Sequence, residues 1–162
     1  MGVLLAALLA VTAVLPMLAS AADRFRPFKL KSVDGGERKL ADVLGKATLV
    51  VFFFPTCGYC KVSLPEVQRL QDSYKEHGLT AVWINVLPEE DRLIPDWRAR
   101  NGFTAPILLG GRSVQRDYDL TMTPTHYLLD AGGRVLFKQA GYTRGDEKAL
   151  EQRIRQALAL SP

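Results

Sequence analysis

Cysteine and histidine are both scarce in this 162-residue chain, which limits the metal sites that it can build. The chain has two cysteines, Cys57 and Cys60, and two histidines, His77 and His126. A structural zinc ion takes four ligands in a closed tetrahedral site. Such a site would use every cysteine and histidine of the chain, although the two histidines lie far from the cysteines in sequence. We therefore expect no structural zinc.

Repeats, low-complexity tracts and clusters of charge are also missing. The net charge is +4, and the basic residues are dispersed along the chain. Nucleic-acid-binding domains instead gather their basic residues on one face or along one helix. We therefore expect no nucleic acid partner, and the length of the chain predicts one compact domain.

The first 22 residues contain no charged side chain. Residues 3–15 are almost wholly Val, Leu and Ala, and Ala-Ser-Ala at 19–21 is typical of a signal peptidase site. No Lys or Arg precedes the apolar run, so an uncleaved membrane anchor is the alternative, although the run is short for a spanning helix. We predict a signal peptide or anchor over residues 1–22, a domain over residues 23–162, and export to the periplasm.

The periodicity of apolar residues predicts alternating strands and helices. Residues 47–54 and 79–87 are apolar runs without alternation, as in strands buried on both faces. A helical pattern links them, which places the two strands in parallel. An early turn at 34–36 and a later hairpin over 125–139 add antiparallel strands, and an amphipathic helix over 145–160 closes the chain. This order predicts an α/β fold with a mixed β-sheet.

Cys57 and Cys60 follow the first buried strand and open the first long helix. A disulfide that closes so short a loop stabilises little, because its stabilisation grows with loop length. The pair therefore suits reversible redox chemistry better than a structural crosslink. Residues three apart share a helix face, and a helix N-terminus favours a thiolate. We predict that Cys57 is the nucleophile and that Cys60 resolves the mixed disulfide.

The stretch Val-Val-Phe-Phe-Phe-Pro-Thr-Cys-Gly-Tyr-Cys-Lys, with Pro65 five residues after the second cysteine, resembles the thioredoxin superfamily. Within it, the chain is most similar to the TlpA/ResA-like periplasmic thiol–disulfide oxidoreductases over about residues 27–158. The resemblance implies a thioredoxin fold with helices on both faces of the sheet, an N-terminal β-hairpin extension and an insert before the cis-proline strand. It also implies that Pro124 is cis and packs against the disulfide, and that the backbone of Thr123 binds a substrate strand. Tyr59, between the cysteines, is expected to contact partners.

The resemblance further implies an exported, monomeric enzyme that exchanges disulfides with protein substrates. It implies no organic cofactor, because the electrons reside on the Cys57–Cys60 pair. A membrane thiol reductant of the DsbD/CcdA kind would regenerate the enzyme. The resemblance favours a reductive role, for example in cytochrome c maturation or in preparing the thiols of a metalloprotein.

Three positions depart from the family pattern. Thioredoxins carry a buried Asp where this chain has Val51, the ResA-like branch often has Glu in place of Ser63, and Trp commonly stands in place of Thr56. Glu66 and Lys61 lie near the cysteines in sequence, but they fit a solvated helix face better. The sequence therefore predicts no proton acceptor for Cys60 and leaves the direction of electron flow open.

Two other functions compete with disulfide exchange. Phe-Phe-Pro ahead of a cysteine resembles the peroxiredoxins, but Phe54 replaces the threonine of their Thr-x-x-Cys motif. A copper-binding metallochaperone of the Sco type would use Cys57, Cys60 and His126, although those proteins have three residues between their cysteines. We expect His126 to pack in the core and keep copper binding as the alternative.

Overall fold

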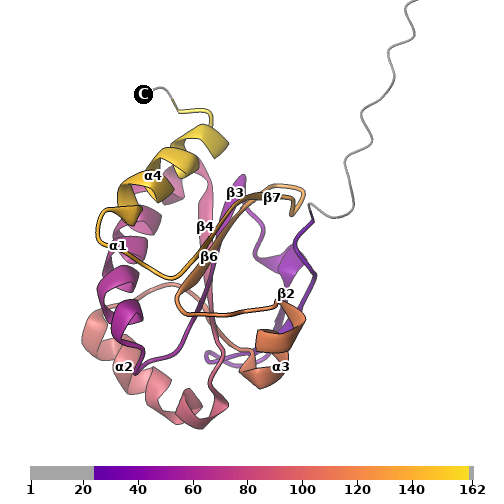
Figure 1. Cartoon of the computed structure of the whole chain (residues 1–162). Helices are drawn as coiled ribbons and strands as arrows, with labels where there is room; N and C mark the ends of the chain where they lie inside the picture. The colour runs from indigo at the N-terminus through magenta and orange to yellow at the C-terminus, as the bar shows by residue number, and fades with distance from the viewer. Residues whose placement is uncertain (1–23, 161–162) are drawn as a thin grey trace, which may run out of the picture.

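A computed structural model describes residues 24–160 (Figure 1). The predicted leader over residues 1–22 lies outside the described residues, so the leader and the domain boundary at residue 23 stay predictions. The strands are β1 (Lys29–Ser32), β2 (Glu37–Lys39), β3 (Ala47–Phe53), β4 (Leu79–Asn85), β5 (Ile107–Leu109), β6 (Thr125–Asp130) and β7 (Val135–Ala140). The α-helices are α1 (Gly58–Tyr74), α2 (Ile94–Asn101), α3 (Gly111–Asp117) and α4 (Asp146–Ala157).

The seven strands form one mixed sheet in the order β2-β1-β5-β4-β3-β6-β7. The central strands β3 and β4 run parallel in the register Ala47–Leu79 to Phe53–Asn85. β6 is antiparallel to β3, and β7 is antiparallel to β6. The N-terminal hairpin of β1 and β2 adds antiparallel strands beyond β5. The predicted mixed sheet, N-terminal hairpin and insert between β4 and β6 are therefore confirmed.

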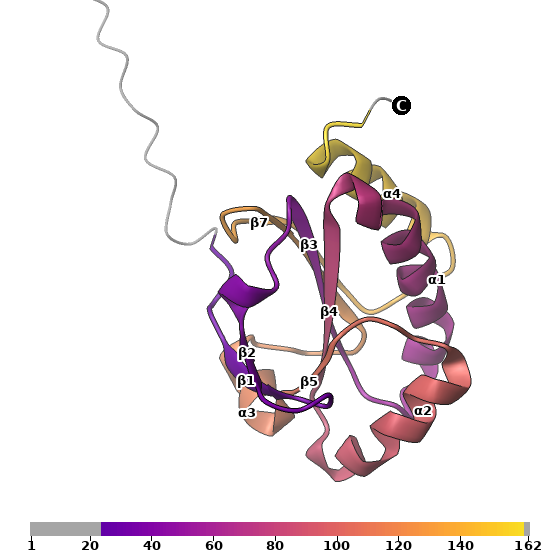
Figure 2. The ribbon, with the colours of Figure 1, turned by 180° about the vertical axis from the view of Figure 1, so that it is seen from behind.

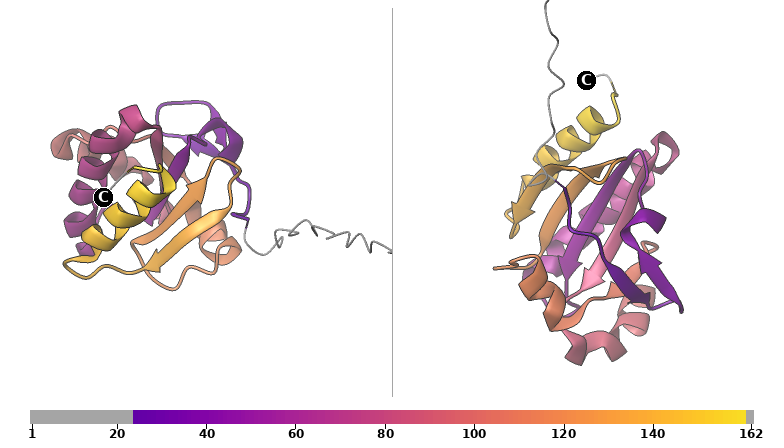
Figure 3. Two further views of the ribbon diagram at one scale, coloured as in Figure 1. Left: turned by 90° about the horizontal axis from the view of Figure 1, so that it is seen from above. Right: turned by 90° about the vertical axis from the view of Figure 1, so that its right-hand side faces the viewer.

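Helices cover both faces of the sheet, as predicted (Figures 1 and 2). Every residue of β3 is buried, which explains why its sequence does not alternate. Leu49, Val51 and Phe53 pack in one core cluster with side chains of α1, α2 and α4. Val50 and Phe52 pack in the other cluster with the N-terminal segment and α3. Figure 3 shows α4 beside β6 and β7, against which it packs.

The insert after β4 differs in one respect from the helix predicted over residues 89–101. A 3-10 helix, Pro88–Leu93, comes first, and the α-helix begins only at Ile94. Pro95 has no N–H for the preceding turn and is best accommodated in the first turn of an α-helix. The Asn85 side chain also donates to the Leu87 carbonyl at 2.8 Å and to Asp91 Oδ1 at 2.7 Å, which holds the 3-10 segment at the end of β4.

Within residues 24–160, no helix combines the length and the apolar character needed to cross a bilayer.

Candidate active site

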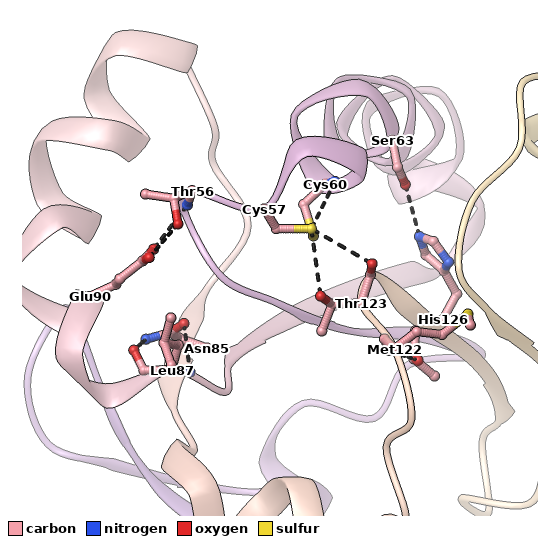
Figure 4. Close-up of a disulfide and its surroundings, with 11 residues drawn as sticks. Thr56, Cys57, Cys60, Ser63, Asn85, Leu87, Glu90, Met122, Thr123 and His126 are labelled. Carbon is pink, nitrogen blue, oxygen red and sulfur yellow. Dashed lines mark hydrogen bonds between the residues drawn. A yellow bond between two sulfur atoms is a disulfide. The ribbon is translucent and has the colours of Figure 1, made fainter.

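A disulfide joins Cys57 to Cys60 at the point where the chain leaves β3 and enters α1 (Figure 4). Cys57 is the N-cap residue of α1, and Cys60 lies in its first turn, with 5.2 Å between the two Cα atoms. The two sulfurs differ in access. Cys60 is 0% exposed, whereas Cys57 is 5% exposed and lies beside a surface groove. The outer sulfur is therefore the one that a second protein can approach.

Three groups surround Cys57 Sγ. The backbone N–H of Cys60 donates to it at 3.1 Å, and the hydroxyl of Thr123 donates to it at 3.6 Å. The carbonyl oxygen of Thr123 lies 3.7 Å from the same sulfur. Hydrogen bonds to a charged acceptor favour the charged form, and the N-terminus of α1 adds a positive dipole end. On reduction, this setting favours a thiolate at Cys57.

The loop before β6 carries the second part of the site. The Thr123–Pro124 peptide bond is cis, as the resemblance implied. The Gly141 N–H donates to the Pro124 carbonyl at 2.8 Å, and the Thr125 hydroxyl donates to the Met122 carbonyl at 2.7 Å. These bonds fix the loop against β7, so that Thr123 faces Cys57 across the gap between β6 and α1.

A groove opens at the surface beside these two parts. It has a volume of about 630 Å³ and is lined by Tyr59, Val62, Met122, Thr123 and residues 140–144. Tyr59 is 67% exposed, and Val62 and Met122 are also exposed. The structure thus places Tyr59 at the surface, where the sequence predicted it, and brings it together with Cys57, Thr123 and the cis-proline loop. The roles of these residues in binding stay predictions.

His126 lies in the interior, where it meets a buried serine. It is 2% exposed, and its Nε2 lies 3.1 Å from Ser63 Oγ. Its Nδ1 is buried without a hydrogen-bond partner. Burial lowers the pKa of His126 from 6.5 to about 4, and the charge of Asp146 offsets only part of that shift. His126 is therefore neutral at pH 7.

This placement bears on the copper alternative. The Nε2 atom of His126 is engaged with Ser63 rather than aimed at a metal. Among residues 24–160, no group of three or more His, Cys, Asp or Glu side chains is placed to hold a metal ion. No observation in the described structure therefore favours the use of Cys57, Cys60 and His126 as a copper site.

A carboxylate contact beside the disulfide was not predicted from the sequence. Glu90 accepts a hydrogen bond from the backbone N–H of Thr56 at 2.9 Å, and its other carboxylate oxygen accepts one from the Thr56 hydroxyl. Thr56 directly precedes Cys57, so this contact holds the backbone next to the disulfide. Glu66, by contrast, pairs with Arg69 at 2.9 Å on an exposed part of α1, as expected for a solvated face.

The fold and the site together define the class. A Cys-x-x-Cys disulfide at the start of the helix after a central strand, opposite a cis-proline loop, is the arrangement of a thioredoxin-fold thiol–disulfide oxidoreductase. The comparisons agree: residues 21–138 match the AhpC/TSA family, and the chain belongs to that family.

Named relatives point to the same chemistry. Thiol-disulfide oxidoreductase YkuV of Bacillus subtilis is 29% identical over 130 residues, which cover 76% of this chain and 86% of that protein. Thiol-disulfide oxidoreductase ResA of Geobacillus kaustophilus is 29% identical over 109 residues, which cover 67% of this chain and 62% of ResA. The match thus spans less than two thirds of ResA. The predicted likeness to ResA-like oxidoreductases is confirmed.

A solved structure from Chlorobium tepidum, assigned as the thiol:disulfide interchange protein DsbE, is also similar. It superposes with a TM-score of 0.77 at 28% identity and covers 84% of this chain and 96% of that one. The two relatives and this structure are all named for thiol–disulfide exchange. Those names agree with the absence of a Thr-x-x-Cys motif at Cys57.

Proposed function

We propose that this protein is an exported reductase of protein disulfides that acts through Cys57-Gly58-Tyr59-Cys60. One observation carries the proposal: Cys57 Sγ contacts Thr123, which lines the groove, whereas Cys60 is wholly buried. Only Cys57 is open to attack on a substrate disulfide. The mixed disulfide then forms at Cys57, and Cys60 releases the product.

The groove supports an extended protein segment as the substrate. Its floor includes Thr123, whose carbonyl oxygen already lies beside Cys57 Sγ. An extended peptide adds to exposed backbone by main-chain hydrogen bonds, and its alternate side chains enter adjacent pockets. In this arrangement Thr123 and Pro124 align the substrate, and Tyr59 and Met122 contact the side chains next to its cysteine.

The reaction cycle needs no organic cofactor. The Cys57 thiolate attacks one sulfur of the substrate disulfide, and the other substrate sulfur leaves with the electron pair of the broken bond. Cys60 then displaces the substrate from Cys57 and regenerates the Cys57–Cys60 disulfide. A membrane thiol reductant of the DsbD/CcdA kind reduces the enzyme again, and the enzyme works as a monomer in the periplasm, free or held by its N-terminal segment. Its substrates include disulfides whose thiols are needed for cytochrome c maturation or for loading a metalloprotein.

Substitution of Cys60 tests this function. Cys60→Ser keeps the outer nucleophile but removes the resolving thiol, so mixed disulfides through Cys57 accumulate when exported proteins are the substrate. Cys57→Ser is the matched control and traps nothing. The wild type is expected to catalyse the reduction of insulin by dithiothreitol. No trapping by Cys60→Ser, together with no insulin turnover by the wild type, contradicts the proposal.

The reduction potential of the pair tests the direction of electron flow. A reductant is expected to have a potential near that of thioredoxin, about −270 mV, whereas a strong oxidant lies near about −120 mV. The potential is measured by equilibration with glutathione or dithiothreitol redox buffers. A value near the oxidant's overturns the reductive role and leaves disulfide exchange itself intact.

A further inference from the structure

Cys60 lies in a place where water does not reach it. It is 0% exposed and belongs to the core cluster on the α1 side of the sheet. In the cycle proposed above, on which this inference rests, Cys60 attacks Cys57 as a thiolate and must first lose a proton. A thiol in apolar surroundings keeps its proton more tightly than one in water. A group next to Cys60 therefore has to accept that proton.

Ser63 and His126 are buried polar residues near Cys60 on the α1 side of the sheet. Ser63 follows Cys60 by three residues in α1, so the two side chains lie on one face of the helix, one turn apart. Figure 4 shows the Ser63 hydroxyl directed at the His126 ring beneath the same part of α1. Ser63 is 1% exposed and His126 is 2% exposed, with 3.1 Å between Oγ and Nε2. Ser63 is too deeply buried to attack an external substrate itself.

The second ring nitrogen of His126, Nδ1, lies near a small cavity. A cavity of about 10 Å³ borders Ser63 and His126, and Nδ1 of His126 is buried without a protein partner. The other polar groups on the cavity are Glu66 of α1, Gln139 of β7, Tyr142, and Asp146 and Glu147 of α4. Of these groups, Asp146 favours a positive charge on the imidazole.

We propose that Ser63 and His126 form the proton-exchange site of Cys60. The Cys60 thiol gives its proton to Ser63 Oγ, and the Ser63 hydroxyl gives its own proton to Nε2 of His126. The electron pair left on Cys60 sulfur forms the bond to Cys57 Sγ. The Cys57–substrate bond breaks, and the substrate sulfur leaves as a thiolate with that bond's electron pair. The proton on His126 returns from Nδ1–H to solvent, and so to the substrate thiolate.

The protonation state of His126 fits this task. Because burial keeps its pKa near 4, the ring is neutral at pH 7 and Nε2 has a free lone pair when Nδ1 carries the hydrogen. General acid–base groups contribute about 10²–10⁴-fold to a rate when their pKa lies near the operating pH, so we expect a smaller contribution of about tenfold from His126. His126 acts through Ser63, so it is a positioning and proton-accepting residue rather than a nucleophile.

The two chemical steps separate in a reaction with dithiobis-nitrobenzoate. The reduced enzyme releases a first nitrothiophenolate when Cys57 attacks and a second when Cys60 resolves the mixed disulfide. We expect Ser63→Ala and His126→Phe to leave the first phase unchanged and to slow the second about tenfold at pH 7. In both variants the second phase should regain its rate as pH rises, because the equilibrium fraction of Cys60 thiolate then increases. The exposed His77→Phe and the α3 variant Ser113→Ala are matched controls and should keep both phases.

The two-phase kinetics test the proton-exchange role and the proposed disulfide exchange separately. A second phase with the wild-type rate and pH profile in both variants overturns the proton-exchange role. Equal slowing of both phases, or slowing that does not depend on pH, also overturns it, because that pattern indicates a disturbed helix start. If His126→Phe does not fold, Ser63→Ala decides, since it removes a single oxygen atom. A wild type that never releases the second equivalent contradicts the proposed function itself.

Discussion

The two sulfurs of one disulfide lie in opposite surroundings. Cys57 faces Thr123 and a groove with exposed Tyr59, and a carboxylate holds the residue before it. Cys60, one helical turn further in, lies in the apolar core, and the nearest polar pair of the core, Ser63 and His126, is uncharged at neutral pH. The same residue type thus receives two roles from burial and neighbouring charge. In the cycle proposed above, the outer half of the site (Cys57, Thr123 and the groove) selects and attacks the substrate, and the inner half (Cys60, Ser63, Leu64 and His126) excludes solvent and accepts the proton.

The largest effect is expected from truncating the inner half. Leu64 is fully buried, whereas its near neighbour Val62 in α1 is 51% exposed at the groove. Leu64→Ala leaves a cavity and should lower the free energy of unfolding by about 2–5 kcal/mol. Val62→Ala should change it by less than about 0.5 kcal/mol. Urea unfolding followed by circular dichroism measures both, and equal losses would show that the two sides of the helix start do not differ in packing.

Acid should weaken the inner half through His126. The pKa of His126 falls from 6.5 to about 4 on folding, so the unfolded chain binds the proton first as pH drops. This contribution is complete above about pH 6.5 and is lost progressively toward pH 4, by about 3 kcal/mol in total.

Unfolding by urea at pH 7, 5.5 and 4.5 measures that loss. His126→Phe should remove this part of the acid sensitivity, and His77→Phe should retain it. Carboxylates also titrate in this range. The informative quantity is therefore the difference between the two variants in how the free energy of unfolding changes with pH. Identical pH profiles for both variants would contradict a buried neutral His126.

The sequence predicted the outer half better than the inner half. The apolar run at 47–54, the Cys-x-x-Cys pair and the proline at 124 are local signals, and all three lie where the pattern placed them. The contact of His126 with Ser63 depends on strand register instead, because β6 pairs with β3 so that His126 lies opposite Val51. No local motif specifies that register, so a packing role for His126 could be predicted from the sequence but its partner could not.

The contact of Glu90 with Thr56 was missed for a similar reason. It joins residues 34 positions apart, through a 3-10 helix where a regular α-helix was expected. The position of Glu90 depends on where Pro95 allows the α-helix to begin and on the hydrogen bonds of Asn85. Long-range geometry of this kind sets the charge around Cys57 and is not visible in the periodicity of the chain.

Glu90 offers a test of charge at the outer half. Its carboxylate lies next to the residue that precedes Cys57 and disfavours a thiolate there. Glu90→Gln should raise the thiolate fraction of Cys57 and stabilise the reduced form by about 1 kcal/mol. The reduction potential should therefore rise by about 20 mV.

Glu89→Gln is the matched control for this charge. Glu89 pairs with Arg112 at 2.6 Å at the surface and should leave the potential unchanged. The potential is measured in redox buffers, and the thiolate by the alkylation rate of Cys57 in the Cys60→Ser background. A lower potential in Glu90→Gln would mean that its contact with Thr56 stabilises the reduced form.

The smallest expected effect concerns the rim of the groove. Arg144 lines it, and among the described residues Arg144 has no ion-pair partner. A substrate with a carboxylate near its disulfide should gain a solvent-exposed pairing with Arg144, of about 0.5–1 kcal/mol. Arg144→Glu should therefore lower kcat/KM for such a peptide several-fold and leave a neutral peptide unaffected. Arg38→Glu, on the far edge strand β2, reverses the same charge away from the groove and should change neither value. Because the pairing is exposed, added salt should shrink the difference between the two peptides; a difference that survives high salt would mean that the groove recognises shape rather than charge.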